Sequence, residues 1–364
     1  MLFGLINLIV IAPMILFSLG VTYLLNNGEP TYKVLTRPEK IEVKAIYMTG
    51  YTAGWKARRE ELINLIETTE LNAVVIDIKD STGRIFFDTN IPLVNKIGAE
   101  DIRIPDLAEL VQDLKSRGIY TIARMVVFQD PYLARSKPEI ALNAKYGGLW
   151  RDWKGLSWVD PTQKFVWDYN MDLAKEAVKL GFDEINFDYI RFPSDGNIKQ
   201  ISFANLKDSS SLGKSEVMKS FYEYLNETLS YVPVITSADM FGMVLWRDDG
   251  LNIGQRFDDA APNFDFIAPM VYPSHYPSGF EGFANPAAHP YEVIYRSLIQ
   301  VEDRLVDSRA QLRPWLQDFD LGAVYTPEMI RLQKQATYDG GGNGWFLWNA
   351  SNNYTVGGLE LAIE

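Results

Sequence analysis

The 364-residue chain contains no cysteine and has only two histidines, His275 and His289. Without thiols it can form no disulfide, thiolate zinc site, iron–sulfur cluster or cysteine nucleophile. Basic residues are also outnumbered, because 35 Lys and Arg stand against 47 Asp and Glu, for a formal net charge of −12. An acidic surface repels phosphate backbones, so nucleic-acid binding is not expected. These shortages leave carboxylates as the main candidates for catalytic groups.

Charge is missing altogether from the first 28 residues, and the stretch Leu2–Leu25 is almost wholly apolar. About 20 such residues are enough to cross a bilayer as a helix. A cleaved signal peptide normally has a basic n-region and a small-residue cleavage site, and this stretch has neither. We therefore predict a transmembrane anchor helix at residues 1–26 and a linker at 27–40. The rest of the chain is expected outside the cytoplasm, tethered to the membrane, or secreted if the anchor is cleaved.

From residue 41 onward, short apolar runs alternate with longer amphipathic ones. The short runs are dense in β-branched residues, which is typical of buried strands. Apolar residues at helical spacing, with Pro near the start or Gly at the end, indicate helices in the longer runs. The pattern predicts strands at 43–48, 72–79, 119–126, 184–190, 233–238, 264–271, 312–316 and 344–348, and helices at 57–69, 105–117, 162–180, 215–230, 291–305, 327–338 and 359–363.

Eight strands interleaved with helices over about 320 residues are typical of a (β/α)8 TIM barrel. Residues 41–364 are therefore predicted to form one barrel domain. A doubly wound open sheet is the alternative, but no strand runs into the Gly-rich turn of a dinucleotide-binding fold. The cluster Gly340–Gly344 precedes a strand instead of opening a helix. No cofactor is therefore expected.

Barrel enzymes build their sites where the strands end. Because side chains alternate along a strand, Asn186 and Asp188 are expected to face the barrel interior, and Asp77 and Lys79 to share a face. A buried Asp77 needs a partner, and Arg124 on the neighbouring strand is the predicted one. The strand-end candidates for the site are Asp77, Lys79, Arg124, Asn186, Asp188, Arg191, Asp239, Tyr272, Gln317, Trp345 and Trp348.

Two carboxylates across an aromatic-lined pocket are the basic equipment of glycoside hydrolysis. One protonates the leaving oxygen, and the other attacks the sugar or activates water. Asp188 and Asp239, at the ends of adjacent predicted strands, are the candidates. A single strand-end Asp is more often a helix cap or an ion-pair partner than a catalyst. The convergence of acids, Arg, Tyr and Trp on one predicted face favours catalysis.

At these residues the chain resembles the DUF4015 type of glycosyl hydrolase-like proteins, a bacterial group expected to form (β/α)8 barrels. The resemblance implies that Asp188 is the nucleophile, since related α-glycosidase barrels place an Asp nucleophile at the end of strand four. Asp239 matches the later acid/base less closely, because amylase-like barrels usually have Glu there. They also have Arg where this chain has Asn186. The resembling stretches are 46–51, 74–83, 123–131, 158–161, 182–193, 237–242, 268–276, 313–319 and 344–349.

The sequence therefore predicts a membrane-tethered glycoside hydrolase that acts on cell-envelope or extracellular polysaccharide. Asp188 and Asp239 would catalyse, with the pKa of Asp239 raised, and the other strand-end candidates would position the sugar. The alternative is a non-catalytic glycan-binding or cell-envelope scaffold, because a barrel does not imply a reaction. Metal-dependent hydrolysis is a weaker third possibility. It would need carboxylates to converge with His275, while His289 is expected to start a helix.

Overall fold

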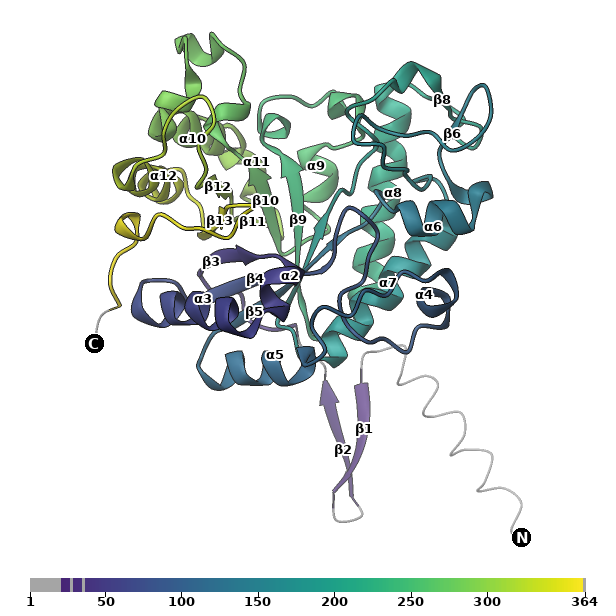
Figure 1. Cartoon of the computed structure of the whole chain (residues 1–364), viewed down its shortest axis with the longest axis horizontal. Coiled ribbons are helices and arrows are strands. Elements are labelled where there is room, and N and C mark those ends of the chain that lie inside the picture. Colours follow the sequence, from purple (N-terminus) through teal and green to yellow (C-terminus); the bar gives the residue numbers. More distant parts are fainter. Residues whose placement is uncertain (1–20, 27–28, 35–36, 363–364) are drawn as a thin grey trace.

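The structure, a computed structural model, describes residues 21–26, 29–34 and 37–362. Its centre is a closed barrel of parallel strands, which confirms the predicted (β/α)8 fold (Figure 1). The last strand pairs with the first, and each of the others pairs with its neighbours in chain order. The strands are β3 (Val43–Met48), β4 (Ala73–Lys79), β5 (Tyr120–Val126), β7 (Glu184–Asp188), β9 (Ile235–Phe241), β10 (Phe266–Met270), β11 (Gln311–Leu312), β12 (Trp315–Gln317) and β13 (Gly344–Trp348).

The seventh barrel strand is split into β11 and β12, which both pair with β10. The break falls at Arg313-Pro314. Proline has no backbone N–H to donate to a ladder, so it interrupts the strand there.

Helices surround the barrel (Figure 1). The predicted helices lie within a few residues of the observed ones, except at the C-terminus. The short pair β6 (Asn143–Ala144) and β8 (Ile201–Ser202) ties together the loops after β5 and β7. The helices are α2 (Gly50–Gly54), α3 (Lys56–Thr68), α4 (Pro92–Ile97), α5 (Leu107–Ser116), α6 (Pro131–Ser136), α7 (Lys164–Lys179), α8 (Ser211–Leu229), α9 (Phe257–Ala260), α10 (Pro290–Leu298), α11 (Glu302–Leu305) and α12 (Pro327–Asp339).

Two apolar layers follow from the alternation of side chains along the strands. One set packs between the strands and the helices, such as Ile46, Val74 and Ile76. The other set fills the barrel interior, such as Val43, Ala45 and Val75. The interior layer ends near the carboxyl ends of the strands, where Tyr47, Tyr272, Trp315 and Trp348 are its last members.

The N-terminal prediction needs correction where the structure describes it. Residues 21–26 form a strand, β1 (Val21–Asn26), instead of the end of a helix. It pairs antiparallel with β2 (Glu29–Val34), which lies in the predicted linker. The reason is visible in the sequence, because Asn27-Gly28 between them is typical of a two-residue hairpin turn.

Most of the predicted anchor, residues 1–20, lies outside the described residues. Within residues 21–26, 29–34 and 37–362, no helix is long and apolar enough to cross a membrane.

The predicted helix at 359–363 is not formed over residues 359–362. A 3-10 turn at Val356–Gly358 is followed by an extended segment in which Leu361 bridges to Thr69 at the end of α3. In this segment the backbone N–H of Ala362 donates to the carbonyl of Thr68 at the end of α3, and the backbone N–H of Glu360 donates to the side chain of Glu70.

Candidate active site

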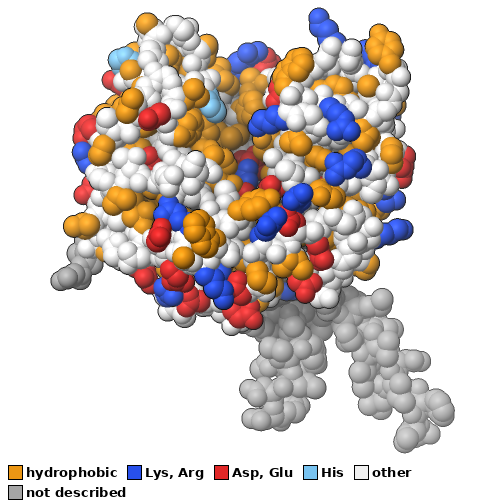
Figure 2. Space-filling model, viewed as in Figure 1, with side chains coloured by type: hydrophobic (Ala, Val, Ile, Leu, Met, Phe, Trp, Pro, Cys, Tyr) orange, Lys and Arg blue, Asp and Glu red, His pale blue; other side chains and the backbone are white. Residues whose placement is uncertain are grey.

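A pocket of about 590 Å³ opens at the carboxyl ends of the barrel strands, with Arg124, Asp188 and Asp239 in its wall. A second pocket of about 610 Å³ adjoins it and shares Tyr272, His275 and Trp348. Figure 2 shows this region as a hollow with apolar walls and charged side chains at its floor. The mouth of the barrel is thus the position expected for a TIM-barrel active site.

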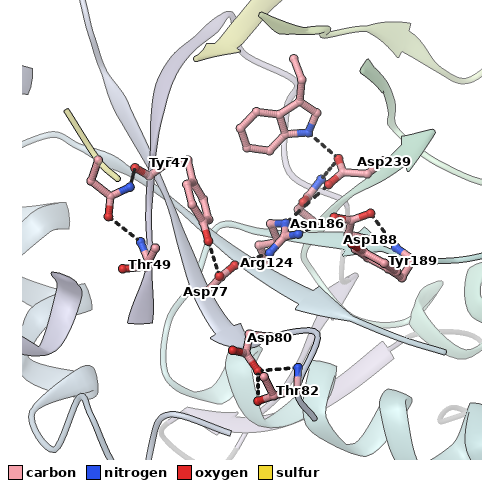
Figure 3. Close-up of polar contacts among 12 residues, drawn as sticks. Tyr47, Thr49, Asp77, Asp80, Thr82, Arg124, Asn186, Asp188, Tyr189 and Asp239 are labelled. Atoms are coloured by element: carbon pink, nitrogen blue, oxygen red, sulfur yellow. Dashed lines mark hydrogen bonds and ion pairs between the residues drawn. The ribbon is translucent and has the colours of Figure 1, made fainter. Parts of the chain in front are cut away.

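The guanidinium of Arg124 lies at the centre of three carboxylates (Figure 3). Its Nη1 donates to Oδ1 of Asp77 at 2.5 Å, and its Nη2 donates to Oδ2 of Asp188. Its Nε lies 3.7 Å from Oδ2 of Asp239. The predicted pairing of Asp77 with Arg124 is confirmed, and the register explains it because the two residues lie directly opposite each other on β4 and β5.

Asp239 is almost fully buried, with 1% of its surface exposed. Its Oδ1 accepts hydrogen bonds from Nδ2 of Asn186 at 2.8 Å and from Nε1 of Trp315 at 2.7 Å. Burial and the negative charge of Asp188 raise the pKa of Asp239 well above its ordinary value, although Arg124 opposes the shift. Asp239 therefore keeps a proton at a pH where an exposed aspartate has lost it.

Asp188 ends β7 and is held from two sides. Besides the bond from Arg124, its Oδ1 accepts the backbone N–H of Tyr189 at 2.6 Å. Tyr189 has a φ of 52°, in the left-handed region that residues other than glycine rarely adopt. Such strained turns cluster at functional sites, where the surrounding structure holds them in place.

Asp77 lies behind Arg124, outside the pocket wall. The hydroxyl of Tyr47 donates to its Oδ2. Burial raises the pKa of Asp77, while Arg124 and the Tyr47 hydroxyl oppose that shift. These contacts make Asp77 a residue that positions Arg124. Asp77 itself does not face the pocket.

Three other predicted residues line the pocket: Arg191, Tyr272 and Trp348. Trp348 stacks on Tyr47 with ring centroids 4.1 Å apart, and the Arg124 guanidinium lies 5.3 Å from the Trp348 ring centre. Burial and the nearby carboxylates of Asp239 and Asp188 raise the pKa of Tyr272, so its hydroxyl stays protonated and can donate.

Lys79 does not share a face with Asp77, which corrects the prediction. The pairing of β4 with β5 shifts register between these two residues, and the irregularity turns Lys79 out of the barrel interior. Its Nζ lies 2.9 Å from Oδ2 of Asp130 and donates to Oδ1 of Asn170 on α7.

Trp345 and Gln317 also lie away from the pocket wall. Trp345 packs fully buried in the layer between strands and helices. It is three residues from Trp348, and positions three apart on a strand face opposite ways. Gln317 is fully buried, where its side chain bonds to Ser274 and to the carbonyl of Phe319.

Several residues of the site were not predicted, and among them Tyr47 and Trp315 bond directly to its carboxylates. Each sits on a strand position that faces the interior, and each is an aromatic residue with a polar hydrogen that reaches a site carboxylate. Alternation along β3 and β12 would have identified both.

His289 lies at the start of a helix, as predicted. His275 lines both pockets, and burial lowers its pKa. His289 precedes α10 and stacks on Phe283. Across residues 21–26, 29–34 and 37–362, no group of three or more His, Asp or Glu side chains is arranged to hold a metal ion.

Residues 45–354 match the family DUF4015, described as "Putative glycosyl hydrolase domain". The chain belongs to this family. It is also similar to a hypothetical protein from Ruminiclostridium thermocellum ATCC 27405, with 40% identity over 53% of this chain and 96% of that chain and a TM-score of 0.48. A comparison with curated proteins finds no match.

Two further solved structures are similar in fold. The PgaB (BpsB) glycoside hydrolase domain from Bordetella bronchiseptica has a TM-score of 0.62 at 15% identity, covering 85% of this chain and 94% of that chain. An α-galactosidase from Thermus thermophilus has a TM-score of 0.53 at 13% identity, covering 87% and 60%. At such identities the likeness shows the barrel fold, and family membership shows a glycosyl hydrolase-like domain.

Proposed function

We propose that this barrel is a glycoside hydrolase in which Asp188 is the nucleophile and Asp239 the general acid/base. The observation that carries the proposal is the unlike setting of two carboxylates in one pocket. Asp188 accepts hydrogen bonds from Arg124 and from the backbone N–H of Tyr189, whereas Asp239 is buried, and burial and the charge of Asp188 raise the pKa of Asp239. A carboxylic acid with a raised pKa beside a second carboxylate is typical of glycosidase sites.

The proposed reaction has two steps. Asp188 attacks the anomeric carbon and forms a glycosyl ester as the glycosidic bond breaks, and Asp239 gives its proton to the leaving oxygen. Water then attacks the same carbon, Asp239 takes the proton from that water, and Asp188 leaves as a carboxylate. Asn186 and Trp315 hold Asp239 by the same oxygen, Oδ1, so its other oxygen is the one that exchanges the proton.

The substrate we infer is an oligosaccharide or polysaccharide. The two adjoining pockets share a wall of Tyr272, His275 and Trp348, so together they offer space beyond a single sugar ring. Aromatic faces at this shared wall, with Phe319 beside them, suit the apolar faces of sugars.

We place the reaction outside the cytoplasm, because the uncharged stretch at residues 2–20 is long enough for a membrane tether.

A second candidate function is a non-catalytic glycan-binding barrel. The observation that favours it is that Asp188 and Asp239 both lie beside Arg124 instead of standing free. The presence of an open pocket next to them favours hydrolysis over this candidate.

The test is a screen of the purified protein against a panel of polysaccharides and aryl glycosides, with release of reducing ends as the measurement. Asp188→Asn is the control, because it keeps the size of the side chain and removes the attacking charge. Hydrolysis by the wild type and none by the variant is expected. Equal hydrolysis by both proteins would contradict the assignment of Asp188, and saturable binding of a glycan without any hydrolysis would favour the binding barrel.

Membrane extraction of the full chain, compared with a variant lacking residues 1–20, tests the tether.

A further inference from the structure

Arg191 lies three residues after the proposed nucleophile and lines the same pocket. Only 6% of its surface is exposed, yet no Asp or Glu in residues 37–362 lies within 4.0 Å of its guanidinium. Burial lowers the pKa of Arg191, while Tyr189 and the more distant carboxylates oppose that shift. A buried cation without a close counter-charge is unusual, because taking a charge out of water is costly unless it is paired.

Three aromatic rings and two acceptors hold the guanidinium in place. Its central carbon lies 4.8 Å from the ring centres of Tyr189 and Phe241 and 5.2 Å from that of Trp158. Nη1 donates to the carbonyl of Phe192 and to Oγ of Ser194, both at 3.1 Å. In the described part of the chain Nε and Nη2 have no hydrogen-bond partner, and neither is among the fully buried polar atoms without one, so both keep some exposed surface on a residue that lines the pocket.

The carboxylates around Arg191 either bond to other residues or are exposed to solvent. Asp188 bonds to Arg124 and to the Tyr189 backbone, and Asp152 accepts from Gln129 and Trp158. Asp195 lines the pocket but is exposed, so solvent screens its charge. Arg124 differs from Arg191, because both of its terminal nitrogens already pair with carboxylates, those of Asp77 and Asp188.

We propose that Arg191 binds a carboxylate of the substrate, which makes the substrate a glycan that contains uronic acid. The inference rests on the proposed glycosidase function and names its substrate class. A planar guanidinium with two adjacent N–H groups free matches a planar carboxylate, which accepts two parallel hydrogen bonds. The aromatic stack fixes the plane of the guanidinium before the substrate arrives, so little rotational freedom is lost on binding.

The test is calorimetric binding to the full-length protein of sugars that differ only at C6. The pairs are methyl glucuronide with methyl glucoside, and methyl galacturonide with methyl galactoside. In at least one pair the carboxylate form should bind about tenfold to a hundredfold more tightly. Arg191→Gln should reduce that ratio to about one, and Arg191→Lys, which keeps the charge but loses the fork, should leave an intermediate ratio.

Arg135→Gln is the matched control. Arg135 also stacks on a tyrosine, with its guanidinium carbon 4.7 Å from the Tyr132 ring centre, but it is exposed and lies outside the pocket wall. It should leave the ratio unchanged. The proposal is overturned if neither pair shows a preference, if the preference survives in Arg191→Gln, or if sulfate competes as well as the uronate.

The binding ratio separates this inference from the function on which it rests. A carboxylate preference that depends on Arg191, in a protein that hydrolyses nothing, supports the subsite and contradicts the glycosidase. Hydrolysis of uronic-acid-containing glycans at equal rates by the wild type and Arg191→Gln supports the glycosidase and contradicts the subsite.

Discussion

Two arginines lie inside the barrel, one at each end, and their surroundings differ. Arg124, at the mouth, faces Asp77, Asp188 and Asp239 and borders an open pocket. Arg313, at the base, is fully buried and pairs with Glu184 at 2.7 Å. Its guanidinium carbon lies 3.4 Å from the Phe266 ring centre. Charge is therefore balanced one to one at the base, and carboxylates are in excess at the mouth.

The same strand supplies a carboxylate to both ends, because β7 begins at Glu184 and ends at Asp188. The two residues are four apart, so both face the interior. The buried pair of Arg313 and Glu184 has no net charge and no open surface for a substrate, and it links two strands of the barrel. In the open cluster at the mouth the pKa of Asp239, which borders the pocket, is raised, and acid catalysis requires such a group. In a TIM barrel the base is expected to serve stability and the mouth chemistry.

The largest expected effect comes from changing the two ends of β7 in turn. Asp188→Asn should lower kcat by at least about 10³-fold, because the attacking carboxylate is lost, and should leave the fold intact. Glu184→Gln should keep the kcat of the folded protein. It should instead lower the free energy of unfolding by about 3 kcal/mol, since Arg313 is left buried without its counter-charge. Initial rates and urea unfolding of both variants test this contrast, which fails if Glu184→Gln loses activity before it loses stability.

The next effect concerns rescue at the base. Arg313→Met should lower the free energy of unfolding by about 3–5 kcal/mol, because it leaves Glu184 charged and buried. The double variant Glu184→Gln/Arg313→Met should recover most of that loss. At the mouth, Asp77→Asn should not rescue Arg124→Met, since Asp188 and Asp239 still lie together there. Thermal unfolding of the four variants measures the difference, and equal rescue at both ends would remove the distinction between them.

A smaller effect is expected in the pH dependence of stability. The folded-state pKa of Asp239 is raised above its unfolded value of about 3.9. Between those two values the folded protein binds more protons than the unfolded chain, so the free energy of unfolding falls as pH rises through that window. Asp239→Asn should make the fall shallower and raise stability at pH 7. Asp77 has the same sign of shift and should account for part of the slope that remains. Urea unfolding from pH 4 to pH 8 measures both slopes, and an unchanged slope would contradict the protonated state of Asp239.

The sequence predicted the barrel well because its evidence is local. Each strand and helix shows its own periodicity, and the order of strands in a barrel follows the order in the chain. The pairing of Asp77 with Arg124 was also predictable, since it needs only two neighbouring strands in register.

The misses depend on longer-range packing or on side-chain alternation. One irregularity after Asp77 turned Lys79 outward, and no feature of the local sequence marks that shift. Trp345 was a different error, because its spacing from Trp348 already placed it on the opposite face. The charge excess at Arg124 needs residues from β4, β5, β7 and β9 to meet, so it required the closed barrel.

The smallest effect tests how far the mouth extends beyond the charged cluster. Phe319 packs edge-on against Tyr272, with ring centroids 5.6 Å apart, and lines only the second of the two described pockets. Phe319→Ala should raise KM for long oligosaccharides about fivefold, the equivalent of about 1 kcal/mol of aromatic contact, and leave kcat unchanged. Aryl monosaccharides, which reach only the first pocket, should show no change. Phe165→Ala, which removes a ring exposed on α7, is the matched control and should alter neither constant. A fall in kcat on the short substrates would mean that Phe319 supports the Asp188 and Asp239 cluster itself, and the mouth would then be one site instead of a charged centre with a separate sugar-binding rim.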